Sequence, residues 1–444
     1  MLRPLLVTLS HALVLAGPLS AVPSGGDGAD ETDGRRSLEE MLEHFRGRRD
    51  QLLAELKGQV SALVAQMDEA AERRDLEALD RLRQDLTRLG PECAPLLLPA
   101  IDPGPQAKSH LELRARHAVR VLSGFPLGAV TDELLALLRS ASSEGKRNAL
   151  RVLAHTAEPE RVSPAIVALF ETAGGSLRQD ALNALARIGG EQNDAFLADQ
   201  LAAADVEVVR FALGALTEAR STAAAARVLS LASSSTAAAP YALEIAAFYS
   251  ACPDVVDGAV CTALLQLARD SRTDDAHAVR ILELLPRFER RWPSSFKKDL
   301  KAVSQSSNRK VSEAALIALA LTNDRGAKRD LLEPYNRRVA DQPDWARVWE
   351  ERADIWYRIG DFKAAIRDFQ DALKVDATNS RPQTDNYVGI ARCYARMGKE
   401  KDAAKWLNDA PVSYLQLRAL ALDPVFAEMA ANPRYRRDVF HLDD

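Results

Sequence analysis

The sequence predicts an all-α protein built as a right-handed α-α superhelix, in which paired helices stack along the chain. The composition suits packed helices, because Ala and Leu are abundant and aromatic residues make up only 6% of the 444 residues. Through the middle of the chain, a small residue followed by apolar ones recurs at a nearly constant interval. A second repeat pattern follows towards the C-terminus. Both patterns are typical of helical repeats rather than of one globular core.

Residues 1–23 have the pattern of a signal peptide. Arg3 supplies a positive charge, residues 5–15 are largely apolar, and Gly17 and Pro18 end any helix. We therefore expect export to the periplasm or out of the cell, with a short membrane anchor or an unprocessed apolar tail as the alternatives. No other segment is apolar over the length of a membrane span, so we expect no integral span in the mature chain.

Residues 24–36 are rich in Gly and Asp, and we expect them to form a flexible linker. A capping-box pattern of Ser37 and Glu40 then starts a long amphipathic helix. A second helix is expected over Asp75–Leu89. We expect residues 37–90 to form a helical hairpin that caps the repeats, and a coiled-coil dimer through the same helices is the alternative.

Residues 91–333 carry seven copies of an alanine followed directly by an apolar residue, with a further apolar or small residue three positions later. Successive alanines are 31, 32, 31, 30, 36 and 37 residues apart. Each copy is followed by a turn and a second apolar stretch, which predicts one helical hairpin per period. A small alanine lets two helices approach closely, so we expect the seven at helix contacts. They are Ala118, Ala149, Ala181, Ala212, Ala242, Ala278 and Ala315.

This stretch, for example Leu177–Gly189, resembles the HEAT family, particularly its short bacterial form. The resemblance implies a curved solenoid and, usually, a binding role. The last two intervals are longer than the rest. The longer loops around Cys252–Gly258 and Arg287–Ser295 are therefore candidates for an additional binding edge.

Residues 334–410 have a different pattern, with a Gly-Asp-aromatic turn and small residues where two helices would cross. The matching residues are Ala346, Trp349, Ala353, Trp356, Gly360, Asp361, Phe362, Ala365, Ile366, Phe369, Ala372, Leu373 and Asp376. This segment resembles the tetratricopeptide (TPR) family, and a weaker second copy has Gly398 at the position of Gly360. The resemblance implies two TPR hairpins, and residues 411–444 resemble the capping helices that close some bacterial TPR arrays.

Helical periodicity places several polar side chains on the expected concave face of these hairpins. The first copy offers Arg347, Glu350, Asp354, Tyr357 and Arg358, and the second offers Asp385, Val388, Arg392 and Arg396. We take five of them as candidate protein-binding residues, namely Arg347, Tyr357, Arg358, Arg392 and Arg396.

Arg392 and Arg396 are four residues apart on one helix, so together they could hold a carboxylate or a peptide terminus. The chaperone-tail clamp of the TPR family uses Lys and Asn where this chain has Glu350 and Asp354. Because these two residues differ, the resemblance does not imply that this chain binds the ligand of that clamp.

The sequence contains no recognisable catalytic or cofactor motif. The seven His residues form no H-E-x-x-H pattern, and neither a P-loop nor a G-x-S-x-G motif occurs. We expect no cofactor. The 58 basic and 63 acidic residues are interspersed, which argues against a nucleic-acid partner. Four scattered cysteines suggest buried free thiols, with a Cys252–Cys261 disulfide as the alternative.

These observations favour a non-enzymatic, protein-binding or scaffolding repeat protein of the bacterial envelope or exterior, with a protein or peptide as partner. Two alternatives stay open. One is a lyase-type enzyme, since some bilin lyases are built from the same short HEAT-like repeats. The other is a structural envelope component that dimerises through the helices of residues 37–90.

Overall fold

The computed structural model describes residues 31–270, 272–376 and 383–442. It is 80% helical and has no β-strand within those ranges, which confirms the all-α solenoid. The chain divides into two compact units, Met1–Pro99 and Ala100–Asp444, which we describe in turn. The expected signal peptide, residues 1–23, and residues 24–30 of the expected linker lie outside the described residues.

The first unit is a helical hairpin of α2 (Glu31–Arg73) and α3 (Leu76–Leu89), followed by the short turn η1 (Pro91–Cys93) and the start of α4 (Ala94–Ile101). Asp75 caps α3 by accepting a hydrogen bond from the Ala78 backbone nitrogen at 2.9 Å. Helix α3 packs on α2, and Leu79, Leu82 and Leu86 of α3 are buried. Because α2 begins at Glu31, residues 31–36 of the expected linker are helical, as elongation of an existing helix adds one hydrogen bond per residue.

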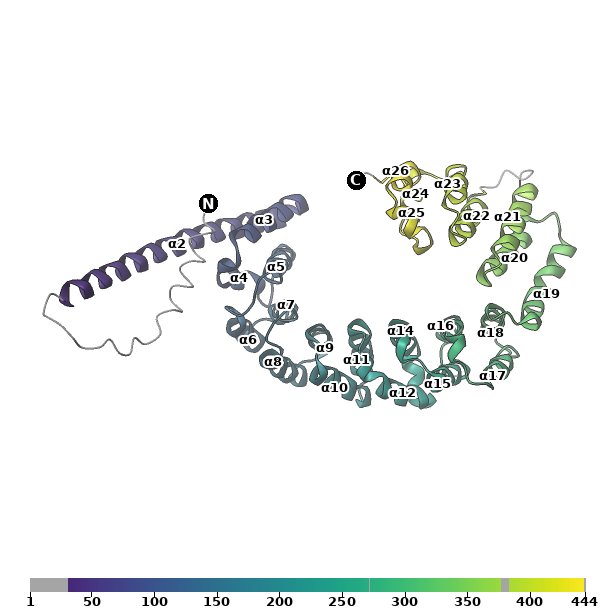
Figure 1. Cartoon of the computed structure of the whole chain (residues 1–444), viewed down its shortest axis with the longest axis horizontal. Helices are drawn as coiled ribbons and strands as arrows, with labels where there is room; N and C mark the ends of the chain where they lie inside the picture. The colour runs from purple at the N-terminus through teal and green to yellow at the C-terminus, as the bar shows by residue number, and fades with distance from the viewer. Residues whose placement is uncertain (1–30, 271, 377–382, 443–444) are drawn as a thin grey trace. The chain divides into compact units, whose positions relative to one another are not determined.

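The second unit begins with hairpins whose helices form two rows (Figure 1). In the first row each helix packs on the next, and the second helices of the hairpins form the other row. The first row consists of α5 (Ser109–Leu122), α7 (Ser143–Leu153), α9 (Gly175–Ile188), α11 (Val206–Ala219), α14 (Ala242–Ala251), α16 (Asp275–Leu284) and α18 (Arg309–Leu321). The second row consists of α6 (Thr131–Ser140), α8 (Pro159–Thr172), α10 (Glu191–Asp199), α12 (Ala225–Ser233), α15 (Gly258–Arg269) and α17 (Phe296–Val303). The short α13 (Ser235–Ala238) lies between α12 and α14.

All seven anchor alanines lie on first-row helices and are at most 2% exposed, which confirms their predicted place at helix contacts. The apolar residue after the alanine is not always buried, because Leu243 on α14 is 41% exposed. The large side chains of Phe248 and Tyr249 fill the core at that hairpin, and Leu243 lies at its edge.

Replacing Ala181 with Leu is expected to lower the free energy of unfolding by about 1 to 3 kcal/mol, because the added methylenes would overpack a fully buried contact between α7, α9 and α11. The matched control is Ala226→Leu, at an exposed position of α12. Urea unfolding followed by circular dichroism measures both variants. Equal midpoints for the two would show that the Ala181 contact is not tightly packed.

Ion pairs on the surface of the second unit also follow the repeat. Arg147 pairs with Asp180 at 3.3 Å and Arg187 with Glu218 at 2.8 Å, each across successive hairpins. Such exposed pairs contribute only about 0–1 kcal/mol each. Their main consequence is that many charges of the array are satisfied by its own neighbouring repeats.

The chain continues through α19 (Arg325–Asp341) into two antiparallel helix pairs that pack on each other. The pairs are α20 (Ala346–Arg358) with α21 (Phe362–Asp376), and α22 (Thr384–Arg396) with α23 (Glu400–Asn408). The last elements are α24 (Tyr414–Leu420), η7 (Pro424–Phe426), α25 (Ala427–Ala431) and α26 (Pro433–Asp438).

Glycine makes both inter-helix turns of these pairs possible. Gly360 has φ of 80° and Gly398 has φ of 69°, in the left-handed region that glycine adopts without steric cost. Ala353, Ala365 and Ala372 are fully buried where the helices cross. The elements from α24 to α26 bury Phe426 and Met429 against α22 and α23.

All four cysteines are free thiols and buried, so the Cys252–Cys261 disulfide does not form in this structure. Burial raises the pKa of Cys93 and of Cys261 to about 11, and that of Cys393 to about 12. A thiol with so high a pKa is almost entirely protonated at neutral pH and therefore a poor nucleophile.

Candidate binding site

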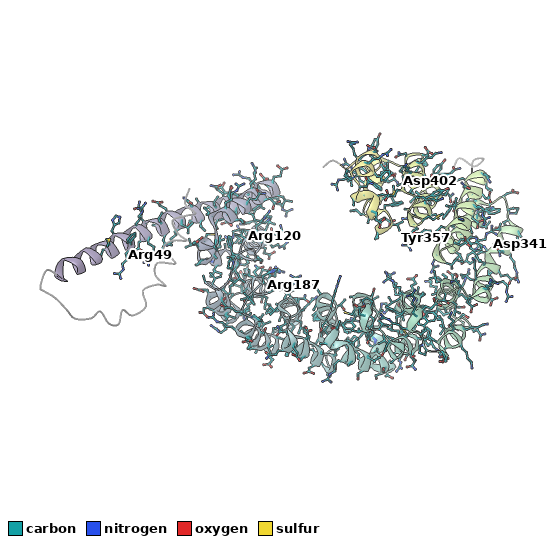
Figure 2. All side chains as sticks on the ribbon, viewed as in Figure 1. Arg49, Arg120, Arg187, Asp341, Tyr357 and Asp402 are labelled. Atoms are coloured by element: carbon teal, nitrogen blue, oxygen red, sulfur yellow. The ribbon has the colours of Figure 1, made fainter. Side chains whose placement is uncertain are left out.

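A cleft of about 720 Å³ lies between α20, α22 and the segment from Val412 to Asp423, and we call it the C-terminal cleft. Figure 2 marks Tyr357 of α20 among the side chains of the second unit. The lining residues are Glu350, Asp354, Tyr357, Phe369, Thr384, Asp385, Asn386, Val388, Gly389, Arg392, Val412, Gln416, Ala419, Leu420, Leu422 and Asp423.

The close approach of α21 and α22 positions one side of the cleft. A Cβ atom at Gly389 would come within 2.7 Å of Cζ of Phe369, so only glycine fits at this contact. With α22 held there, Asp385 and Asn386 in its first turns line the same cleft as Glu350 on α20.

Asn386 links the two helices. Its Nδ2 donates a hydrogen bond to Oε1 of Glu350 at 2.9 Å, and the residue is only 1% exposed. The Oδ1 atom of the same amide is buried without a hydrogen-bond partner among the described residues. Reversing the amide would place Oδ1 against the Glu350 carboxylate, so the Nδ2 bond fixes its orientation.

The cleft carries an excess of negative charge. Among the described residues, its lining has four carboxylates and a single guanidinium, that of Arg392. Nε of Arg392 donates a hydrogen bond to Oδ2 of Asp423 at 3.0 Å, and Nη2 forms an ion pair with the same oxygen at 2.9 Å. The Arg392–Asp423 pair therefore neutralises itself, and the charges of Glu350, Asp354 and Asp385 are left in excess within the lining.

The pKa of Asp354 is raised above its usual value, mainly because the surrounding protein atoms displace water from the carboxylate. The negative charges of Glu350 and Asp385 raise it further, while Arg358 and Arg392 act in the opposite direction. The side chain is still open to solvent at the cleft surface. The empty cleft thus disfavours the charged form of Asp354, and a bound cation would favour it.

The opposite wall of the cleft is apolar. Val412 and Leu420 are half-buried, and Leu422 is 85% exposed. Tyr414 and Leu415 on the outer face of α24 are also largely exposed. Exposed apolar side chains beside a polar floor are typical of a surface that a partner covers.

Of the five predicted binding residues, two line the C-terminal cleft and three do not. Tyr357 and Arg392 line the cleft. Arg358 instead pairs with Glu313 of α18 at 2.9 Å and with Glu283 of α16.

The other two predicted residues lie outside the cleft lining. Arg347 pairs with Glu351 on its own helix at 3.1 Å, and Arg396 is exposed on α22. The two arginines of α22 therefore do not point as a pair into the cleft, since Arg392 is already bound to Asp423.

The longer repeat loops line a second depression, of about 540 Å³. Arg287, Glu289 and Arg290 surround it together with Ser250. Arg291 donates a hydrogen bond to the Val256 carbonyl at 2.8 Å and so holds the two loops together. The guanidinium of Arg291 therefore stabilises the fold at the edge of this depression.

Within the described ranges, no group of three His, Cys, Asp or Glu side chains could hold a metal ion. In the same ranges, no helix combines the length and apolar composition needed to cross a membrane.

The paired helices and their stacking define the class of protein as an all-α helical-repeat solenoid. A family model of HEAT repeats matches residues 131–217, which run from the start of α6 into α11. No curated protein matches the chain significantly.

Proposed function

We propose that this chain is a non-enzymatic scaffold that holds a protein or peptide partner in the C-terminal cleft. The observation that carries the proposal is the cleft itself, which combines a charged floor, the aromatic ring of Tyr357 and an exposed apolar wall. Interfaces are typically built from such a mixture. The match to HEAT repeats supports the proposal, since helical repeat proteins commonly bind proteins.

We further propose that α20 to α23 are two TPR hairpins. The helix bounds, the glycine turns and the buried alanines at the helix crossings all agree with the TPR pattern. The proposal also places the protein in the bacterial envelope or outside the cell. That part is supported by the signal-like pattern of residues 1–23.

An Ala419→Trp variant is expected to lose its partner, because Ala419 is an exposed lining residue and an indole there would fill the cleft without disturbing the core. The matched control is Ala427→Trp, at an exposed position outside the lining. Affinity capture from periplasmic and secreted fractions, followed by mass spectrometry, compares both with the wild type. A partner retained equally by all three chains would place the site elsewhere, and full-length protein found only in the cytoplasm would contradict export.

A specific observation also favours a second candidate, a structural component that dimerises through α2. Along residues 41–53 of this helix, Met41 is 51% exposed, Phe45 50% and Leu53 48%. A second copy of the helix could cover such a stripe. Sedimentation of the full chain tests for this dimer, because a monomer at micromolar concentration would exclude dimerisation through α2.

A further inference from the structure

The charge of the C-terminal cleft indicates the charge of the ligand that it binds. Glu350 and Asp354 are one helical turn apart on α20, and Asp385 lies in the first turn of α22. Arg392, the one cation among the described lining residues, is bound to Asp423. An incoming carboxylate would have to displace Asp423 and approach three further negative charges, whereas an incoming cation would be attracted by them.

A buried acceptor in the cleft gives a second, independent indication. Asn386 is 1% exposed, and its Oδ1 has no hydrogen-bond partner among the described residues. Because its Nδ2 is committed to Glu350, Oδ1 needs a donor that the described residues do not supply. An ammonium or guanidinium group has several donors and no acceptor, so it could satisfy Oδ1 and the carboxylates together.

The remaining lining suits the rest of a basic side chain. The ring of Tyr357 lies beside the acidic floor, and an aromatic face attracts a cation. The apolar wall of Val412, Leu420 and Leu422 would cover aliphatic atoms. Lys and Arg combine an apolar stem with a charged end, which matches an apolar wall next to an acidic floor.

We propose that the C-terminal cleft binds an extended peptide segment of a partner through a Lys or Arg side chain. The charged end contacts Glu350, Asp354 and Oδ1 of Asn386, and the neighbouring apolar residues lie on the 412–422 wall. This inference rests on the proposed function, and it gives the ligand the opposite charge to the one that Arg392 and Arg396 predicted from the sequence.

The test uses the immobilised full chain and four degenerate libraries of 12-residue peptides, amidated at the C-terminus, whose central residue is Lys, Arg, Ala or Glu. We expect Lys and Arg libraries to be retained about tenfold more than the Glu library. Equal retention of all four, or preference for Glu, overturns the inference but leaves a peptide-binding function in place. No retention of any library overturns both.

Two double variants test whether the preference for the Lys and Arg libraries comes from the C-terminal cleft. The double variant Glu350→Gln, Asp354→Asn keeps the shape of both side chains and is expected to lose the preference for Lys and Arg. Glu171→Gln with Asp254→Asn makes the same change of net charge at exposed positions outside the cleft, and it should keep the preference. If both double variants lose it alike, the preference comes from overall charge and the site assignment is overturned.

The Arg392→Gln variant tests directly whether the cleft prefers a cationic or an anionic ligand. It releases Asp423 and makes the cleft more negative, so retention of the Lys library should rise by about two- to fivefold. Decreased retention of the Lys library, or a gain for the Glu library, would overturn the inference. Circular dichroism of each variant confirms that the helices are intact.

Discussion

An Arg352→Met variant is expected to lose about 3 kcal/mol of its free energy of unfolding. In the wild type, Nε and one terminal nitrogen of Arg352 on α20 donate to both carboxylate oxygens of Asp368 on α21, at 2.7 and 2.8 Å. Only 7% of the Asp368 side chain is exposed. Methionine keeps the apolar stem but leaves that carboxylate buried without its partner, which is the costly part of breaking a buried ion pair.

The same guanidinium also joins α20 to other elements. A third nitrogen of Arg352 donates to Oδ1 of Asn336 on α19 at 3.0 Å, and the group lies 5.0 Å from the centre of the Trp349 ring. The variant should therefore loosen the contact between α19 and the two helix pairs as well as the Asp368 contact. Urea unfolding followed by circular dichroism and tryptophan fluorescence measures the loss.

A double variant provides the control. In Arg352→Met, Asp368→Leu no charge is left unpaired, so most of the lost stability should return. The exposed pair of Arg337 and Glu333 on α19 gives a second comparison, because Arg337→Met should change stability by no more than about 0.5 kcal/mol. A double variant as unstable as Arg352→Met would mean that side-chain shape, and not the unpaired charge, causes the loss.

The repeat fold could be predicted because its signal is local and recurs. An alanine at a helix crossing is required once per hairpin, so Ala181 and Ala212 reveal the period without knowledge of their neighbours in space. Leu243 could not be predicted to be exposed, since its position depends on how Phe248 and Tyr249 fill the core of that hairpin. The start of α2 was also missed, because Gly- and Asp-rich residues continued a helix that the following segment had already formed.

The site could be predicted only where it follows the face of a single helix. Glu350, Asp354 and Tyr357 are spaced three or four residues apart, and all three line the cleft. The partner of Arg392, in contrast, is Asp423, 31 residues further along the chain and in another element. Without that contact the sequence suggested a free arginine and hence an anionic ligand.

Other parts of the site depended on local geometry that the sequence did not reveal. Asn386 stands at an unremarkable position of α22, and only its burial and its bond to Glu350 show that Oδ1 has no donor within the described part of the chain. Arg358 directly follows Tyr357 on α20, but Glu283 and Glu313 of the repeat helices bind it. Helical periodicity gives the direction of a side chain, and it does not give the neighbours that pair with it.

Binding of a lysine-bearing peptide to the C-terminal cleft is expected to weaken as the pH falls, by about tenfold once Asp354 is protonated. The raised pKa of Asp354 means that this loss begins at a higher pH than for an ordinary Asp, whose value is 3.8. Glu350 and Asp385 add to the shift, while Arg358 and Arg392 oppose it. Lysine stays charged throughout this range, so the change comes from the protein.

The Asp354→Asn variant tests separately how this carboxylate affects the stability of the fold and the binding of the peptide. In the unliganded chain the folded-state pKa of Asp354 lies above the unfolded value, so the group destabilises the fold at neutral pH, and this penalty is relieved as the pH falls through the folded pKa. The variant should therefore unfold at a higher urea concentration than the wild type at pH 7, yet bind the peptide more weakly and with less dependence on pH. Isothermal titration calorimetry between pH 7 and pH 4 and urea unfolding measure the two effects. A variant that binds as tightly as the wild type at pH 7, or that is less stable than it, would contradict the placement of Asp354 in a cation-binding cleft.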